Sequence, residues 1–180
     1  IWCIIYYAIY IRLGLYTFNI GFFLDSVLHG TVSYHLYFVI IITQMYILGP
    51  IFYKILKDSN NRILVLVIFA IITALCAEHL TFKYSDRVFL KYIFFYMLGM
   101  YVTLEQEKFV AFVKKNRILI ALGYIAASGL YTLASFYNYS FYMYVWFVFS
   151  LFSVFFIYYV GLVMKEKLDK VYSFIKVFGQ

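Results

Sequence analysis

The side chains best suited to acid–base chemistry in this sequence are histidines that lie near acids. Asp25 precedes His29, and Glu78 directly precedes His79. A histidine beside a carboxylate is the usual general-base pairing, because imidazole titrates near neutral pH. Glu78 and His79 diverge by about 100° on a helix, however, so the two cannot face one point.

A second set of polar side chains lies in the apolar run YHLYFVIIITQMYILGP. On a helix His35, Thr43, Tyr46 and Pro50 fall within one arc of roughly 80°, and Gln44 lies nearly opposite. Lipid cannot satisfy polar side chains, so we expect this arc to face the helix bundle or a wet cavity. The chain's only proline should kink the helix and free a backbone carbonyl.

Each of these residues also has a structural interpretation. His35 could begin a helix at the membrane interface, while Tyr46 and Gln44 could join helices by hydrogen bonds. No two histidines have the i, i+4 spacing of a common metal-ligand pair, and Cys3 and Cys76 lie singly in apolar runs. The sequence therefore predicts no metal site and no disulfide.

The composition indicates which elements position these side chains. Hydrophobic residues make up 66% of the 180 residues and charged residues 13%, whereas soluble domains are nearer half and a quarter. The net charge of +7 is better explained by membrane topology than by a nucleic-acid partner. We predict an all-α, polytopic transmembrane helical bundle in a lipid bilayer.

The apolar stretches predict about five full spans and a truncated one at the start. A span needs about 20 apolar residues. The uncharged run 118–164 would form a helix of about 70 Å, against a hydrocarbon core of about 30 Å, so it must fold back near Asn138. The predicted spans are residues 36–53, 63–82 and 88–104 and the two halves of 118–164.

Lysines and arginines predict the orientation. Eleven of the 15 lie in loops 54–62, 108–117 and 165–176, and the other four lie in the alternate loops. The positive-inside rule places the first set in the cytoplasm. The outer side then holds all three histidines and three of the acids, namely His29, His35, His79, Asp25, Glu78 and Asp86.

Two shorter segments fit no span. Residues 105–117 predict an amphipathic helix on the membrane surface, with an anionic-donor site at Lys114, Lys115 and Arg117 as the alternative. Residues 13–24 are too short to span, and we expect an interfacial or re-entrant segment or a surface loop. Because both ends of the chain are apolar, we expect 1–180 to be a single domain and an internal fragment lacking both ends.

Three stretches resemble a known family. HLYFVIIITQMYILGP, residues 35–50, resembles the pattern His-Leu-Trp-Phe-Leu, closed by a proline, in acyltransferase family 3 integral-membrane proteins. YIFFYMLGMYV, residues 92–102, resembles the family's aromatic span, and FIKVFGQ resembles the lead-in to a later segment. Within the family the aromatic density is most similar to the polysaccharide intercellular-adhesion type.

This resemblance implies a membrane-embedded O-acyltransferase of a bacterial plasma membrane. It implies that acyl-CoA donates an acetyl or succinyl group to a hydroxyl of a cell-envelope polysaccharide or lipid-linked sugar, without a metal. The family's key Arg and His lie in a first span outside this sequence. The residues that match the family's pattern are His35, Tyr46 and Pro50, and the resemblance makes His35 and Tyr46 candidate catalytic residues. From their own places in the predicted spans, Gln44, Glu78 and His79 are candidate substrate-binding residues.

Two other classes of protein remain open on the sequence. A polysaccharide transporter or flippase subunit would also have polar, proline-kinked spans. A purely structural subunit would lose no activity on removal of His35 or Tyr46. Acyl-CoA-dependent acylation of a glycan by the intact protein distinguishes the three.

Overall fold

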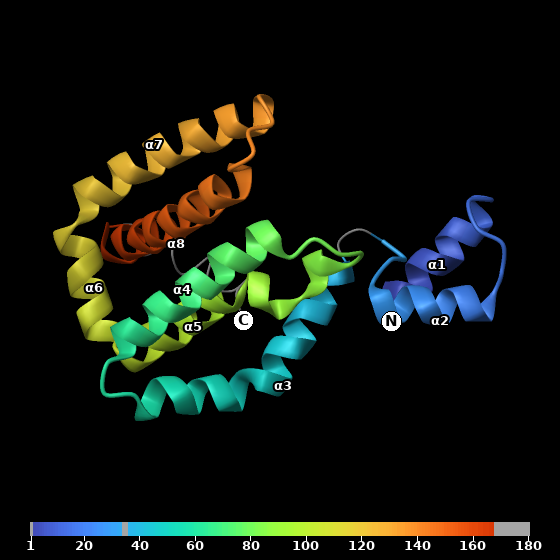
Figure 1. The fold of residues 1–180 in the computed structure, drawn as a ribbon, viewed down its shortest axis with the longest axis horizontal. Helices are drawn as coiled ribbons and strands as arrows, with labels where there is room; N and C mark the ends of the chain where they lie inside the picture. The colour runs from blue at the N-terminus through green and yellow to red at the C-terminus, as the bar shows by residue number, and fades with distance from the viewer. Residues whose placement is uncertain (1, 34–35, 168–180) are drawn as a thin grey trace. The chain divides into compact units, whose positions relative to one another are not determined.

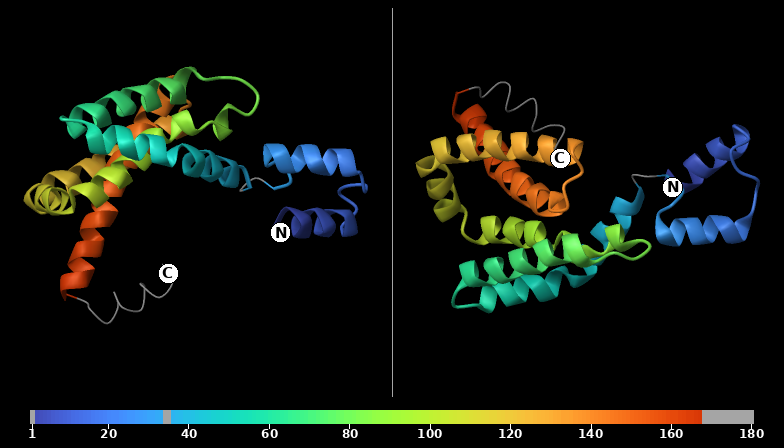
Figure 2. Two further views of the ribbon diagram at one scale, coloured as in Figure 1. Left: turned by 90° about the horizontal axis from the view of Figure 1, so that it is seen from below. Right: turned by 45° about the horizontal axis from the view of Figure 1, so that its top comes forward.

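The structure is a computed structural model that describes residues 2–33 and 36–167. Within these residues it contains eight α-helices and two short 3₁₀-helices, which confirms the all-α prediction (Figures 1 and 2). The helices are α1 (Trp2–Arg12), α2 (Ile20–His29), α3 (Tyr37–Asp58), α4 (Arg62–His79), α5 (Ile93–Leu104), α6 (Gln106–Lys115), α7 (Arg117–Phe136) and α8 (Tyr142–Lys167), and the 3₁₀-helices are η2 (Ser85–Arg87) and η3 (Phe89–Lys91).

Four helices in the described part of the chain, α3, α4, α7 and α8, are long and apolar enough to cross a membrane. The fifth predicted span, 88–104, instead comprises η3 and the 12-residue helix α5. Twelve helical residues rise only about 18 Å. The helix begins late because the backbone before it is hydrogen-bonded to a side chain of α3, as described below.

Polar residues and glycine mark the helix ends. Asn19 and Asn61 each accept a backbone N–H in the first turn of the following helix, at 3.0 and 3.1 Å. Gly30 ends α2 in the left-handed conformation, with φ +60°. Asn138 has φ +51° between α7 and α8, which confirms the predicted turn in the long uncharged run.

The contacts divide the chain into two compact units, Ile1–Met100 and Tyr101–Gln180. In the first unit α4 packs beside η3, and the N–H of Phe94 donates to the fully buried hydroxyl of Thr73 at 3.1 Å. Leu56, Ile93 and Met97 are fully buried. The single-domain organisation stays a prediction.

Helices α1 and α2 are joined through Tyr7. Its hydroxyl accepts the N–H of Asn19 at 3.0 Å, and its ring lies 4.9 Å from that of Phe23. The segment expected to be interfacial or re-entrant is a turn that runs into the first half of α2. Residues of this turn line an open depression together with Phe22.

In the second unit α7 and α8 form an antiparallel hairpin (Figure 1). Tyr124 stacks on Phe156 at 4.5 Å and Tyr131 on Phe149 at 4.9 Å, both nearly parallel. Helix α6 is amphipathic, as predicted, but its buried Phe109 packs against aromatic rings of α8.

Candidate functional site

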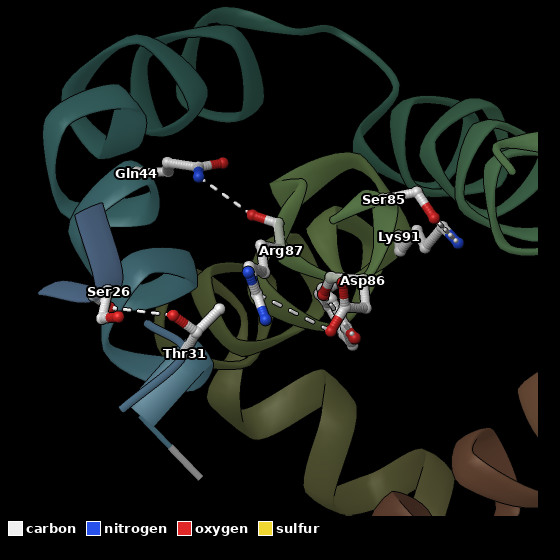
Figure 3. A network of polar contacts seen from close by, with 8 residues as sticks. Ser26, Thr31, Gln44, Ser85, Asp86, Arg87 and Lys91 are labelled. Carbon is white, nitrogen blue, oxygen red and sulfur yellow. Dashed lines mark hydrogen bonds and ion pairs between the residues drawn. The ribbon is translucent and has the colours of Figure 1, made fainter. Parts of the chain in front are cut away.

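Gln44, which lies inside α3, binds the backbone of the segment before α5 with both ends of its amide. The amide nitrogen donates to the carbonyl of Arg87 at 2.9 Å, and the amide oxygen accepts the N–H of Phe89 at 3.0 Å. Figure 3 shows the first of these bonds. Because both amide groups are paired, Gln44 can remain half-buried in an apolar helix.

Two further hydrogen bonds hold the same segment. The ammonium group of Lys91 donates to the hydroxyl of Ser85 at 3.3 Å, and the hydroxyl of Tyr92 donates to the carbonyl of Asp86 at 3.1 Å. Residues 85–92 are therefore fixed on α3 and on themselves, with 3₁₀ pairing in place of the α-helical pattern (Figure 3).

Tyr84 directly precedes this segment, and two basic side chains lie over its ring. The guanidinium carbon of Arg87 lies 4.3 Å from the centre of its ring and the ammonium nitrogen of Lys83 lies 4.8 Å away. The imidazole of His29, at the end of α2, stacks on the same ring at 4.7 Å. Tyr84 has φ +72°, an uncommon conformation for a bulky residue.

His29 has a fixed orientation. Its Nδ1 lies 2.9 Å from the carbonyl oxygen of Asp25 and 3.1 Å from a carboxylate oxygen of the same residue. Both partners accept hydrogen bonds, so the proton of a neutral ring belongs on Nδ1. Nε2 then keeps a lone pair, which is the arrangement of a general base.

The guanidinium group of Arg87 is incompletely paired. Its Nε and Nη1 are buried and have no hydrogen-bond partner among the described residues. The carboxylate of Asp86 lies 3.9 Å from Nε, at the outer limit of an ion pair. A buried oxygen of Glu78 also lacks a partner within the described ranges. Unpaired buried polar groups are rare in folded proteins and point to a missing ligand or to strain.

The predicted polar arc of α3 does not face the rest of the first unit. Tyr46 is 74% exposed, and the exposed hydroxyl of Thr43 donates to the carbonyl of Val39 in its own helix. That expectation is wrong within the first unit, because the buried side of α3 lies about 120° away from this arc and includes a glycine that lets a neighbour approach. The buried residues of α3 are Ile41, Met45, Gly49, Phe52 and Leu56.

The other predicted site residues are placed separately. His35 lies outside the described residues. Glu78 is half-buried and His79 is exposed at the last position of α4. The structure thus brings Gln44 to the 85–92 segment and leaves Tyr46 apart from it; the catalytic and substrate-binding roles stay predictions.

Sequence reasoning missed Tyr84 and Arg87. In the sequence Arg87 counted only as one of the positive charges that set the topology. The signal that could have found them is the polar run KYSDR, residues 83–87, which follows the predicted span 63–82. Gln44, a polar residue inside the preceding predicted span, was available to contact it. Within the described ranges no three histidine, cysteine or acidic side chains are grouped as a metal site.

The comparisons with known proteins bear on the chain as a whole. A family model described as an acyltransferase domain, that of acyltransferase family 3, matches residues 1–180. Neither the curated proteins nor the solved structures gave a match. Together with four helices able to span a membrane, the match over the full length shows that this chain belongs to the acyltransferase 3 family of integral-membrane acyltransferases.

Proposed function

We propose that this protein transfers an acetyl or succinyl group from acyl-CoA to a hydroxyl of a cell-envelope polysaccharide or lipid-linked sugar. The family membership supports the acyl transfer. The observation that supports an acceptor site on the outer side is the segment fixed by Gln44, which carries Arg87 with unpaired guanidinium nitrogens.

The reaction needs a base, an electrophile and a group that stabilises negative charge. The base takes the proton of the acceptor hydroxyl, whose oxygen attacks the thioester carbonyl, and the CoA thiolate leaves and takes up a proton. His35 and Tyr46 remain our candidate catalytic residues, with His35 acting on the acceptor. A guanidinium group can stabilise a developing oxyanion by charge and hydrogen bonds.

Gln44, Glu78 and His79 are proposed to act on the acceptor. The contacts of Gln44 support an indirect role, because its amide is fully used in holding residues 87 and 89. We place the protein in a bacterial plasma membrane and among modifiers of intercellular-adhesion polysaccharides, with no metal and no nucleic acid. The resemblance of the aromatic stretches to the family supports the bacterial membrane and the polysaccharide class. The concentration of Lys and Arg in alternate loops supports a membrane topology rather than a nucleic-acid partner.

The test is transfer of label in membranes that contain the intact protein. Acyl-CoA labelled in its acyl group is supplied on the cytoplasmic side with a glycan acceptor outside. We expect label in the glycan and roughly a hundredfold or more slower transfer with H35A, the lower end of the contribution of general acid–base catalysis. Glycan export without label would favour the transporter alternative, and unchanged transfer by H35A would remove His35 from the site.

A further inference from the structure

Two cationic side chains lie against the ring of Tyr84, and the ligand that they would bind is not yet specified. Arg87 and Lys83 lie 4.3 and 4.8 Å from its centre. The imidazole of His29 stacks on it from α2 and is itself held by Asp25. Two segments that are far apart in sequence thus meet at one ring, and the positive charge there comes from Lys83 and Arg87.

Arg87 is the member of this cluster with spare hydrogen-bonding capacity. Its side chain is only 16% exposed, and its buried Nε and Nη1 have no hydrogen-bond partner among the described residues. A guanidinium group binds a carboxylate or phosphate through N–H groups on one edge of its plane. Nε and Nη1 belong to different edges, so a bound oxyanion would pair one of them and remove part of the cost of leaving them unpaired.

The acids nearby do not saturate the site. Asp86 reaches Arg87 only at 3.9 Å, and its own side chain is 53% exposed to solvent. Asp25 is engaged with His29. An oxyanion at ordinary hydrogen-bond distance, about 2.8 Å, would interact with the guanidinium more strongly than Asp86 does.

The backbone under Arg87 is held in place. The amide of Gln44 bonds to the carbonyl of Arg87 and to the N–H of Phe89, and Lys91 bonds to the hydroxyl of Ser85; Figure 3 shows the first and the last of these. The hydroxyl of Tyr92 donates to the carbonyl of Asp86. A cation on a segment fixed by four such bonds is pre-organised, so binding a ligand requires little ordering.

We propose that Arg87 and Lys83, positioned on Tyr84, bind an oxyanion carried by the acceptor, and so select acidic glycans or lipid-linked sugar phosphates over neutral ones. This rests on the proposed function for its acceptor, but the site itself is a binding site that needs no acyl donor. The shared chemistry is a phosphate or a carboxylate attached to a sugar.

The experiment measures binding without acyl-CoA, using the intact protein in phosphatidylcholine nanodiscs and ligand-observed NMR. The probes are glucose 1-phosphate, glucuronate and neutral glucose. We expect at least one acidic sugar to bind and glucose not to bind. R87Q should weaken acidic-sugar binding about tenfold or more, and R87K should weaken it less, since lysine keeps the charge but loses the paired donors.

The matched control is R12Q, which removes an exposed arginine at the end of α1 on the same predicted side and should bind as wild type. Equal binding of glucose and the acidic sugars, or R87Q behaving as R12Q, overturns the proposal. Loss of acidic-sugar binding in phosphatidylglycerol nanodiscs assigns the site to a lipid headgroup and also overturns it. If binding holds but no acyl group is transferred, the proposed reaction fails while the anion site stands.

Discussion

At the scale of single residues, the most informative contact is the one that Gln44 makes across 43 positions of sequence. An amide inside an apolar helix is unfavourable unless both its donor and its acceptor are used. Here the amide replaces the helical partners that residues 87 and 89 would otherwise have, so one side chain stabilises an irregular segment at the end of a membrane helix.

Replacing Gln44 by alanine should release that segment. The carbonyl of Arg87 and the N–H of Phe89 would lose their partners, at a cost of about 1–3 kcal/mol in unfolding free energy. We expect a lower midpoint of thermal unfolding and faster trypsin cleavage after Lys83 and Arg87. Thr43→Val is the control, since that hydroxyl bonds only within α3. Equal cleavage rates in Q44A and T43V would contradict the assignment.

Helical periodicity correctly separated Gln44 from the arc of Thr43 and Tyr46, because side-chain direction on a helix follows from a fixed rotation per residue. It did not identify which arc is buried, since that depends on the neighbouring helices. The contacts of Arg87 with Gln44 and Tyr84 could not be predicted for a similar reason. Its place is set by the 3₁₀ and left-handed backbone around Tyr84, and no periodic pattern describes such a backbone.

At the scale of elements, α3 and α5 approach closely at Gly49, next to the proline that interrupts the hydrogen bonds of α3. A Cβ at this position would lie 2.6 Å from the hydroxyl oxygen of Tyr96, whereas the next ring atom is 3.7 Å away. The packing of the two helices thus depends on one missing methyl group and one hydroxyl.

Gly49→Ala should therefore force the Tyr96 side chain to shift, and because its hydroxyl is the far end of that side chain we expect a cost of about 1 kcal/mol, the low end of overpacking. Tyr96→Phe removes the clashing oxygen, so the double variant G49A/Y96F should recover most of the stability that G49A loses. The measurement is the midpoint of thermal unfolding in detergent for both single variants and the double variant. Simple additivity of the two changes would show that the contact is absent.

The α7–α8 hairpin gives an independent case. A Cβ at Gly123 would lie 2.2 Å from a ring carbon of Phe152, whereas one at Gly129 in the same helix meets nothing within 4 Å. We expect Gly123→Ala to lower the thermal midpoint, at a cost of about 1–3 kcal/mol, and Gly129→Ala to be neutral or slightly stabilising. The opposite order of the two midpoints would contradict this packing.

At the scale of the whole molecule, four of the spans predicted from hydropathy correspond to helices long and apolar enough to cross a membrane, because each is a long, largely uncharged run. It overestimated the fifth, because hydropathy measures apolar content and is blind to where the backbone stops being helical. Helix α5, with η3 and the residue between them, reaches about 26 Å at most, slightly less than a hydrocarbon core of about 30 Å.

The orientation of the loops tests whether α5 crosses the membrane. The asymmetric distribution of 15 Lys and Arg places Ser85 and Asn138 outside and Asn116 in the cytoplasm, which requires a crossing between residues 85 and 116. Single cysteines at these positions, in a protein with Cys3 and Cys76 replaced by alanine, can be treated with a membrane-impermeant maleimide. We expect S85C and N138C to react in intact cells and N116C only after permeabilisation.

Reaction of S85C and N116C from the same side would show that α5 stops within one leaflet. Residues 85–92 and α6 would then share a membrane face, so the anion site at Arg87 would lie on the side of the donor. Because the α7–α8 hairpin crosses twice, N138C would in that case lie opposite to both. The three cysteines therefore decide together whether Arg87 meets the acceptor or acyl-CoA.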